Sequence, residues 1–129
     1  MPHHFVTSGP GLPPAPSPIS QTVVAGTHCY ISGQLAVDGA GVFQAGTARD
    51  EAALAFRNVF AAAEAAGCGR HEIVYDDVAF IDPADVAEVN ALYAELFAEG
   101  RRPARTIYQA AALPHGGRIK VQAVAVRES

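Results

Sequence analysis

The stretch RRPARTIYQAAALPHGGRIKVQAVAV, residues 101–126, contains the pattern that constrains the fold most. Its last part alternates between two sets of residues: Ile119, Val121, Ala123 and Ala125 in one, and Arg118, Lys120, Gln122, Val124 and Val126 in the other. Successive side chains of a strand point to opposite faces, so we predict a strand over 118–126 with one buried face. A second strand is predicted over about 105–112, joined to it by LPHGG.

Arg105 stands at the start of this apolar run, just after Pro103. An arginine at such a position can end a strand in solvent, pair with an acidic side chain, or bind an anion. The local sequence leaves all three roles open.

Two amphipathic helices are predicted upstream. Thr47 and Asp50 have the spacing of a capping box, and Gly67 follows the expected end of the first helix. Asp82 and Pro83 suit the start of a second helix that runs to about Ala98. The apolar face of the first helix comprises Ala52, Phe56, Val59, Phe60 and Ala63, and that of the second Val86, Val89, Tyr93 and Leu96.

Asn90 interrupts the apolar face of the second helix, so we expect a buried partner for its side chain.

Two short strands are predicted over 22–35 and another over 72–81. In the strand over 72–81, Asp76 and Asp77 are adjacent and must point to opposite faces, so they cannot form a carboxylate pair. Residues 9–18 are proline-rich, and 37–46 form a glycine-rich loop without phosphate-binding spacing.

This order of elements predicts a single domain, 1–129, of the α+β class: two layers, with a mixed β-sheet and two helices on one of its faces. The other face would carry Val, Ile and Tyr side chains. A monomer should not leave such a surface exposed, so we expect an oligomer.

Composition narrows the class of protein. The chain has 129 residues and a formal net charge of −4, and GRRPAR at 100–105 is its only arginine cluster, so the composition argues against nucleic acid as a partner. No apolar run is long enough to span a membrane, and no secretory signal is visible. We therefore expect a cytoplasmic protein.

Cysteines and histidines show no metal-binding pattern, so no metal site is predicted. We expect Cys29 and Cys68, which are far apart in sequence, to be two buried free thiols. His3 and His4 are expected in a loose N-terminal segment, and the other histidines are scattered.

The chain resembles the Rid family, also called the YjgF/YER057c/UK114 family, along nearly its whole length. The resemblance rests on five segments in the family's order and spacing: SPISQTVVAG, YISGQLAVD, NVFAAAEAAG, VNALYAELF and RPARTIYQAAALPHGGRIKVQAVAV. It implies a chorismate-mutase-like fold, a homotrimer with ligand clefts between subunits, and deaminase-like hydrolase chemistry without a cofactor. The archetypal family enzyme hydrolyses enamines and imines to 2-keto acids and ammonia.

The resemblance also assigns candidate site residues. Arg105 occupies the position that binds the carboxylate of small keto or imino acids, a task that suits the planar guanidinium. Backbone N–H groups near Gly33 and Ile107 would complete the anion pocket, with Ser32 and Asn90 as structural support. Tyr75 either lines the same cleft or packs in the core.

Two positions depart from the family pattern. Gln122 replaces the glutamate associated with water activation, and it cannot accept a proton. Ile19 replaces a tyrosine and makes the cleft more apolar. Lys120 stands where a glutamate is frequent, and it either points to solvent or adds a second anion contact.

The sequence is compatible with three functions. The protein could hydrolyse enamine or imine intermediates, with Arg105 orienting the carboxylate and Gln122 in the catalytic position. It could instead bind a small carboxylate metabolite without turnover. The third function, RNA cleavage, is ascribed to some family members, but the acidic net charge argues against it.

Overall fold

The computed structural model describes residues 2–128, which form one six-stranded sheet and two α-helices. In chain order these are β1 (His4–Val6), β2 (Thr22–Ala25), β3 (His28–Gln34), α1 (Ala48–Ala65), β4 (Ile73–Phe80), α2 (Val86–Leu96), β5 (Ala104–Gln109) and β6 (Ile119–Val126). Three short 3-10 helices lie in the connections: η1 (Arg70–Glu72), η2 (Pro83–Asp85) and η3 (Pro114–Gly116).

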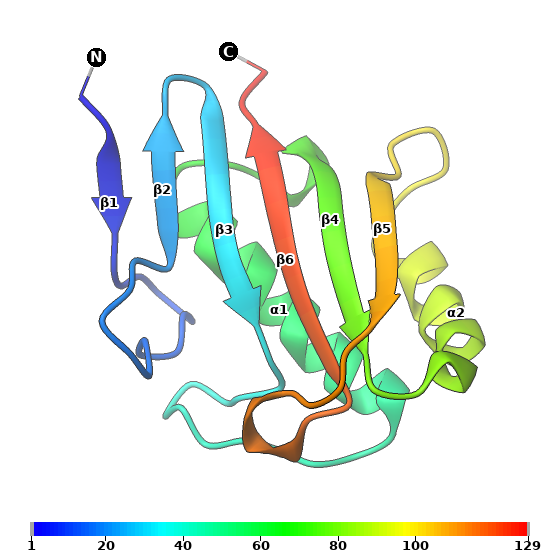
Figure 1. Ribbon diagram of the computed structural model, residues 1–129. Coiled ribbons are helices and arrows are strands. Elements are labelled where there is room, and N and C mark those ends of the chain that lie inside the picture. Colours follow the sequence, from blue (N-terminus) through cyan, green and yellow to red (C-terminus); the bar gives the residue numbers. More distant parts are fainter. Residues whose placement is uncertain (1, 129) are drawn as a thin grey trace.

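The strand order in the sheet is β1-β2-β3-β6-β4-β5. Neighbouring strands are antiparallel except β4 and β5, which are parallel because α2 carries the chain back between them. Both helices lie on the same side of the sheet (Figure 1). The predicted two-layer α+β fold with a mixed sheet is therefore confirmed.

The predicted start and end of α1 are confirmed. The Thr47 hydroxyl accepts a hydrogen bond from the backbone N–H of Asp50 at 3.1 Å, and the Asp50 carboxylate accepts one from the N–H of Thr47 at 3.2 Å. Gly67 follows the helix with φ of 83°, a conformation that costs little only for glycine.

The second helix begins where the sequence predicts. Asp82 accepts a hydrogen bond from the N–H of Ala84 at 2.9 Å, and Pro83 is the first residue of η2, which leads directly into α2. α2 ends at Leu96, slightly before the predicted end near Ala98.

The core lies between the sheet and the two helices. The predicted alternation of β6 is confirmed, since Ile119, Val121, Ala123 and Ala125 are all buried. Aromatic rings of both helices and the residue after α2 pack against one another, and they are Phe56, Phe60, Tyr93 and Phe97. This packing fixes the orientation of Tyr93.

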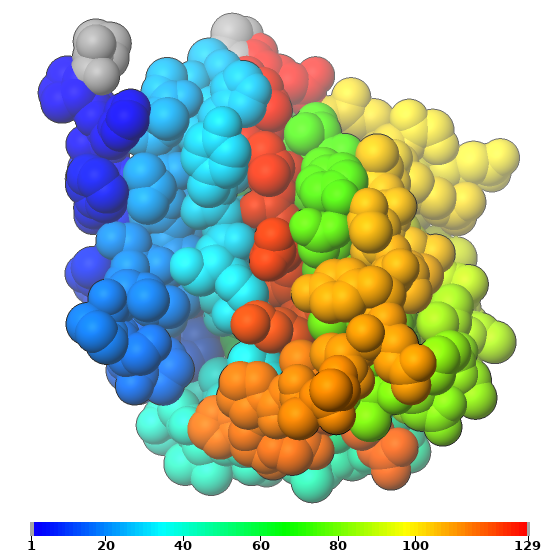
Figure 2. Space-filling view, viewed as in Figure 1, coloured from blue at the N-terminus to red at the C-terminus, as the bar shows by residue number. Residues whose placement is uncertain are grey.

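The opposite face of the sheet remains open. Figure 2 looks onto this face and shows the side chains of β3, β6, β4 and β5 next to one another, without a second layer over them. Tyr30 and Tyr108 are about half exposed there. The expectation of an uncovered face with apolar side chains is confirmed for the described residues.

Two expectations are wrong. His4 belongs to β1, which pairs with β2 and covers the edge of the sheet, so this part of the N-terminal segment is not loose. Cys29 and Cys68 are both buried, but the structure joins them in a disulfide instead of leaving two free thiols. The sequence did not reveal this pair because only the packing of α1 on the sheet brings Cys68 over β3.

Neither helix in residues 2–128 is long and apolar enough to cross a membrane.

Candidate functional site

The side chain of Arg105 lies on the face of β5 that is turned toward α2, where two residues hold it. Its Nη1 donates a hydrogen bond to Oδ1 of Asn90 at 2.8 Å, and its Cζ lies 4.7 Å from the centre of the Tyr93 ring. Asn90 and Tyr93 are three positions apart on α2 and therefore share one face of the helix. The guanidinium thus has a defined place without a ligand.

Asp76 lies behind this arrangement, fully buried, at the position of β4 that pairs with Arg105 of β5. The Tyr93 hydroxyl donates a 2.7 Å hydrogen bond to its Oδ2, whereas its Oδ1 has no partner among the described residues. Burial raises the pKa of Asp76 to about 6, although the Tyr93 hydrogen bond and the charge of Arg105 act in the opposite direction. Burial and the Asp76 carboxylate also raise the pKa of Tyr93.

An open cleft of about 410 Å³ lies in front of Arg105, lined by Asn90, Tyr93, Ala94, Arg102, Pro103 and Arg105. Within residues 2–128, no carboxylate forms an ion pair with Arg105. A guanidinium carries five N–H donors, and the bond to Asn90 uses only one of them. We call Asn90, Tyr93 and Arg105 the arginine half-site. Its chemistry suits a small anion, a carboxylate above all.

A second group of predicted residues lies near the start of β2 and the end of β3. The Ser32 hydroxyl donates a 2.7 Å hydrogen bond to the carbonyl of Ser20, which ties β3 to the loop that carries Ile19. Ile19 is 45% exposed, and it lines a small cavity of about 60 Å³ together with Gly33. The stem of Lys120 lies across Gly33, so a side chain at position 33 would displace it. We call Ile19, Ser32, Gly33 and Lys120 the glycine half-site.

Gln122 lies on the open face of the sheet and belongs to a chain of hydrogen bonds across three strands. Its Nε2 donates to Oδ2 of Asp77 at 3.1 Å, and the Tyr75 hydroxyl donates to Oδ1 of Asp77 at 2.8 Å. The Tyr75 oxygen also lies 2.7 Å from the hydroxyl of Thr106. We call these four residues the open-face network. Tyr75 is half-buried on this face, so the alternative of core packing is wrong.

The predicted site residues do not converge within one chain. Gly33 lies on β3 and Arg105 on β5, with β6 and β4 between them. Strands in a sheet lie about 4.8 Å apart, so about 14 Å separates the two strands. Ile107 shares the helix-facing side of β5 with Arg105 and packs against the core, whereas Gln122 faces the other way. The structure therefore places Arg105 and Gly33 in two separate groups of residues.

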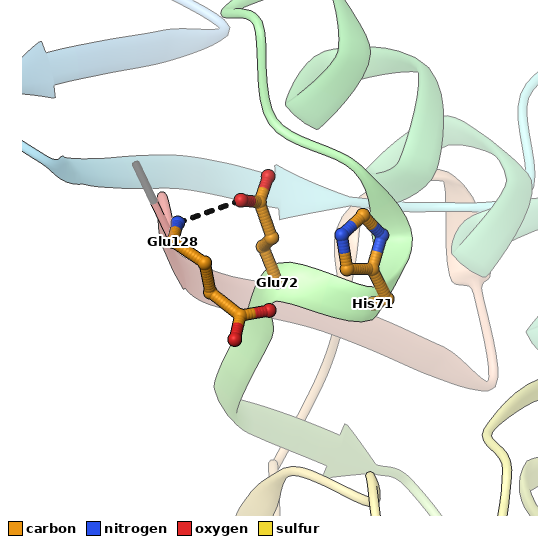
Figure 3. Close-up of side chains that lie close together, drawn as sticks. All are labelled: His71, Glu72 and Glu128. Atoms are coloured by element: carbon orange, nitrogen blue, oxygen red, sulfur yellow. Dashed lines mark hydrogen bonds between the residues drawn. The ribbon is translucent and has the colours of Figure 1, made fainter.

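A further cluster lies where η1 meets the end of β6, and its members are His71, Glu72 and Glu128 (Figure 3). The Glu72 carboxylate accepts hydrogen bonds from the N–H groups of Gly69 and Glu128, at 2.9 and 2.7 Å, and these bonds lower its pKa. Arg101 pairs with the Glu128 carboxylate at 2.5 Å. These contacts fasten the end of β6 to η1, so we assign the cluster a structural role.

Several residues of these groups were not identified from the sequence. Tyr93 was assigned to the core, which is where its ring lies, but its hydroxyl and ring face also hold Asp76 and Arg105. Its spacing of three positions from Asn90 on the same helix is the sequence signal that could have placed it beside the site. Asp77 and Thr106 become neighbours of Gln122 and Tyr75 only through the pairing of β4 with β6 and β5.

Comparison with known proteins assigns the chain to a family. Residues 12–127 match the family model described as endoribonuclease L-PSP. The chain is 40% identical over 116 residues to the 2-iminobutanoate/2-iminopropanoate deaminase of Bos taurus, which covers 89% of this chain and 84% of the relative.

Solved structures agree with this assignment. The yeast protein YEO7 superposes with a TM-score of 0.92 at 25% identity, over 98% of this chain and all of that one. TdcF of E. coli, solved with bound serine, superposes with a TM-score of 0.88 at 31% identity, over 97% of this chain and all of that one. The chain therefore belongs to the endoribonuclease L-PSP family, which is the Rid (YjgF/YER057c/UK114) family that its motifs resemble.

Proposed function

We propose that this protein binds small 2-imino acids, or their enamine tautomers, and hydrolyses them to 2-keto acids and ammonia without a cofactor. The observation that carries the proposal is the guanidinium of Arg105, which Asn90 and Tyr93 hold beside an open cleft without a carboxylate partner among the described residues. Relatives named as imine deaminases support the reaction class. A solved relative with bound serine, itself a small carboxylate, supports the ligand class.

The proposed chemistry is an addition followed by an elimination. The substrate carboxylate binds to Arg105, which places the imine carbon. The oxygen of a water forms a bond to that carbon while the electron pair of the C=N π bond moves to nitrogen, which also takes up one water proton. The remaining hydroxyl proton then passes to nitrogen, the C–N bond breaks, and ammonia leaves the keto acid. Proximity to a fixed carboxylate anchor accelerates the first step.

A complete site requires a second copy of the chain in this proposal. The arginine half-site of one copy would meet the glycine half-site of another, in a homotrimer with its ligand sites between subunits. Gln122 shares one face of β6 with Lys120, so it would enter the site from the same copy as the glycine half-site. Two features support this arrangement: the distance between the half-sites within one chain, and the uncovered sheet face with Tyr30 and Tyr108. The Ile107 backbone N–H would lie close to Arg105, and that of Gly33 would come from the other copy.

A second function is favoured by Gln122. An amide can orient a water but cannot take up its proton, so the protein could bind a carboxylate metabolite without turnover. The alternatives separate in one assay, in which an amino-acid oxidase generates imines in situ and semicarbazide traps those that are not hydrolysed. Faster release of keto acid with added protein supports the hydrolase. Saturable binding of 2-oxobutanoate in calorimetry, without any gain in release, supports the binding function.

A further inference from the structure

We infer that Asp77 is a positioning residue that fixes the side-chain amide of Gln122 so that its oxygen, not its nitrogen, faces the attacking water. The inference deepens the proposed hydrolase function and rests on it. The two residues face each other on the open side of the sheet, as register partners of β4 and β6. Gln122 Nε2 donates to Asp77 Oδ2 at 3.1 Å.

The chemistry of the pair selects one orientation of the amide. An ionised carboxylate only accepts hydrogen bonds, so the side of Gln122 that faces Asp77 must be the NH2 group. Its Oε1 then points away from Asp77, and none of the described residues donates a hydrogen bond to it. An acceptor in this place can hold a water by one of its O–H groups, which leaves a lone pair of that water free for the imine carbon.

Asp77 is itself held in place from the other side. The Tyr75 hydroxyl donates its proton to Asp77 Oδ1, so the hydroxyl of Thr106, 2.7 Å away, must be the donor toward the Tyr75 oxygen. All donors in the open-face network therefore point toward Asp77. The carboxylate that the family resemblance places at position 122 is absent, and a carboxylate stands instead on the neighbouring strand, one cross-strand step away.

This geometry changes what Gln122→Glu would do. The new carboxyl would stand opposite Asp77 at hydrogen-bonding distance, and two like charges so close share a proton, which raises one of the two pKa values. Replacing Asp77 as well would remove this coupling. The other titratable groups on this face are the same in every variant: His28, Tyr30, Tyr75, Tyr108 and Lys120.

The pairing can be tested without any activity, by following the carboxyl carbon of Asp77 in a pH titration by NMR. In Gln122→Glu we expect two coupled steps, with the upper midpoint about one pH unit or more above that of Asp77 in the unmodified protein. In Gln122→Leu, a single step should remain. If Asp77 titrates identically in the unmodified protein and in Gln122→Glu, the two side chains do not interact and the inference is overturned.

The positioning role is tested by keto-acid release. Asp77→Ala frees the Gln122 amide to rotate, so kcat should fall about tenfold while KM changes little, as for loss of orientation at the reacting centre. Asp77→Asn keeps an acceptor but permits both orientations of the Gln122 amide. Its kcat should therefore lie between those of the unmodified protein and Asp77→Ala. Glu64→Ala removes an exposed carboxylate of α1, on the other side of the sheet from this network, so it is the control and should retain activity.

An unchanged kcat in Asp77→Ala would overturn the positioning role even where the titration shows the pair. The failure of the proposed function looks different: the unmodified protein would release no keto acid above the background. In that case both the hydrolase function and the positioning role of Asp77 are contradicted. The NMR titration still decides whether the side chains of Asp77 and Gln122 interact.

Discussion

Nη1 of Arg105 lies 2.8 Å from Oδ1 of Asn90, and this bond joins β5 to α2 at the mouth of the cleft. An amide oxygen orients the guanidinium without neutralising it, so the positive charge remains for an anionic ligand. A carboxylate in the place of Asn90 would occupy the same donor and cancel that charge.

Arg105→Ala should weaken binding of small carboxylates by roughly 2–5 kcal/mol, as is typical when one partner of a desolvated charge pair is removed. Arg105→Lys should recover only part of the loss because an ammonium lacks the planar fork. Calorimetry with pyruvate, 2-oxobutanoate and benzoate measures both effects. Arg102→Ala is a suitable control, since Arg102 lines the same cleft but bonds to the carbonyl of Phe97. Equal affinity of a ligand for the unmodified protein and Arg105→Ala would show that Arg105 is not its anchor.

Asn90→Asp should lower the affinity for the same ligands by about tenfold or more, because the incoming carboxylate then meets a like charge. Asn90 is exposed, so the nearly isosteric change should leave the fold intact, which thermal unfolding can verify. Undiminished affinity in Asn90→Asp would mean that the ligand approaches Arg105 from another side.

Asp76 should make stability depend on pH. Its pKa in the folded protein is raised from 3.8 to about 6, so the folded state disfavours the ionised form. The contribution of Asp76 to the free energy of unfolding is therefore fully present below about pH 4, and it is lost as the pH rises through 6. Asp76→Asn cannot ionise, so the stability of the wild type relative to this variant should fall by at most roughly 3 kcal/mol between pH 4 and pH 8. Urea unfolding across that range measures the difference, and a constant difference would contradict the raised pKa.

The uncovered sheet face should form the contact between copies. We expect light scattering to give the mass of a homotrimer at micromolar concentration, and Tyr108→Glu to shift the protein toward monomer, because Tyr108 is 48% exposed on that face. A stable monomer of the unmodified protein would remove the shared site from the proposal.

Gln122 should limit the rate of hydrolysis. General-base assistance is typically worth 10²–10⁴-fold, so we expect the unmodified protein to hydrolyse 2-aminoacrylate and 2-iminobutanoate slowly. Gln122→Glu combined with Asp77→Asn should raise the rate without changing keto-acid affinity. High activity of the unmodified protein would show that this reaction needs no base at position 122.

The fold was largely predictable because its signals are local. Thr47 and Asp50 begin α1, Asp82 and Pro83 begin the second helix, and the alternation of β6 separates its two faces. The strand β1 was missed because three residues with two exposed side chains carry no periodic signal. The link between Cys29 and Cys68 was missed because the two residues are 39 positions apart.

The candidate site was predictable only in part. The role of Arg105 came from a motif, and that of Asn90 from a polar residue on an apolar helix face. We expected a buried partner for the Asn90 side chain. Among the described residues its partner is Arg105, and Arg105 is only partly buried, so this expectation is wrong. The opposite directions of Asp76 and Asp77 were correctly inferred from strand geometry, but their partners Tyr93 and Gln122 depend on helix packing and strand register.

The central claim, that one site is built from two copies of the chain, is tested most directly by mixing two inactive variants. Arg105→Ala lacks the carboxylate anchor, and Gln122→Leu lacks the group that holds the water. Each alone should release keto acid at background rates. After co-expression in equal amounts, about a quarter of the sites should combine an intact Arg105 with an intact Gln122 from another copy, and activity should return to about that fraction of the wild-type rate. Background activity of mixed oligomers, alongside measurable wild-type turnover, would place both residues in one chain's site and contradict the account.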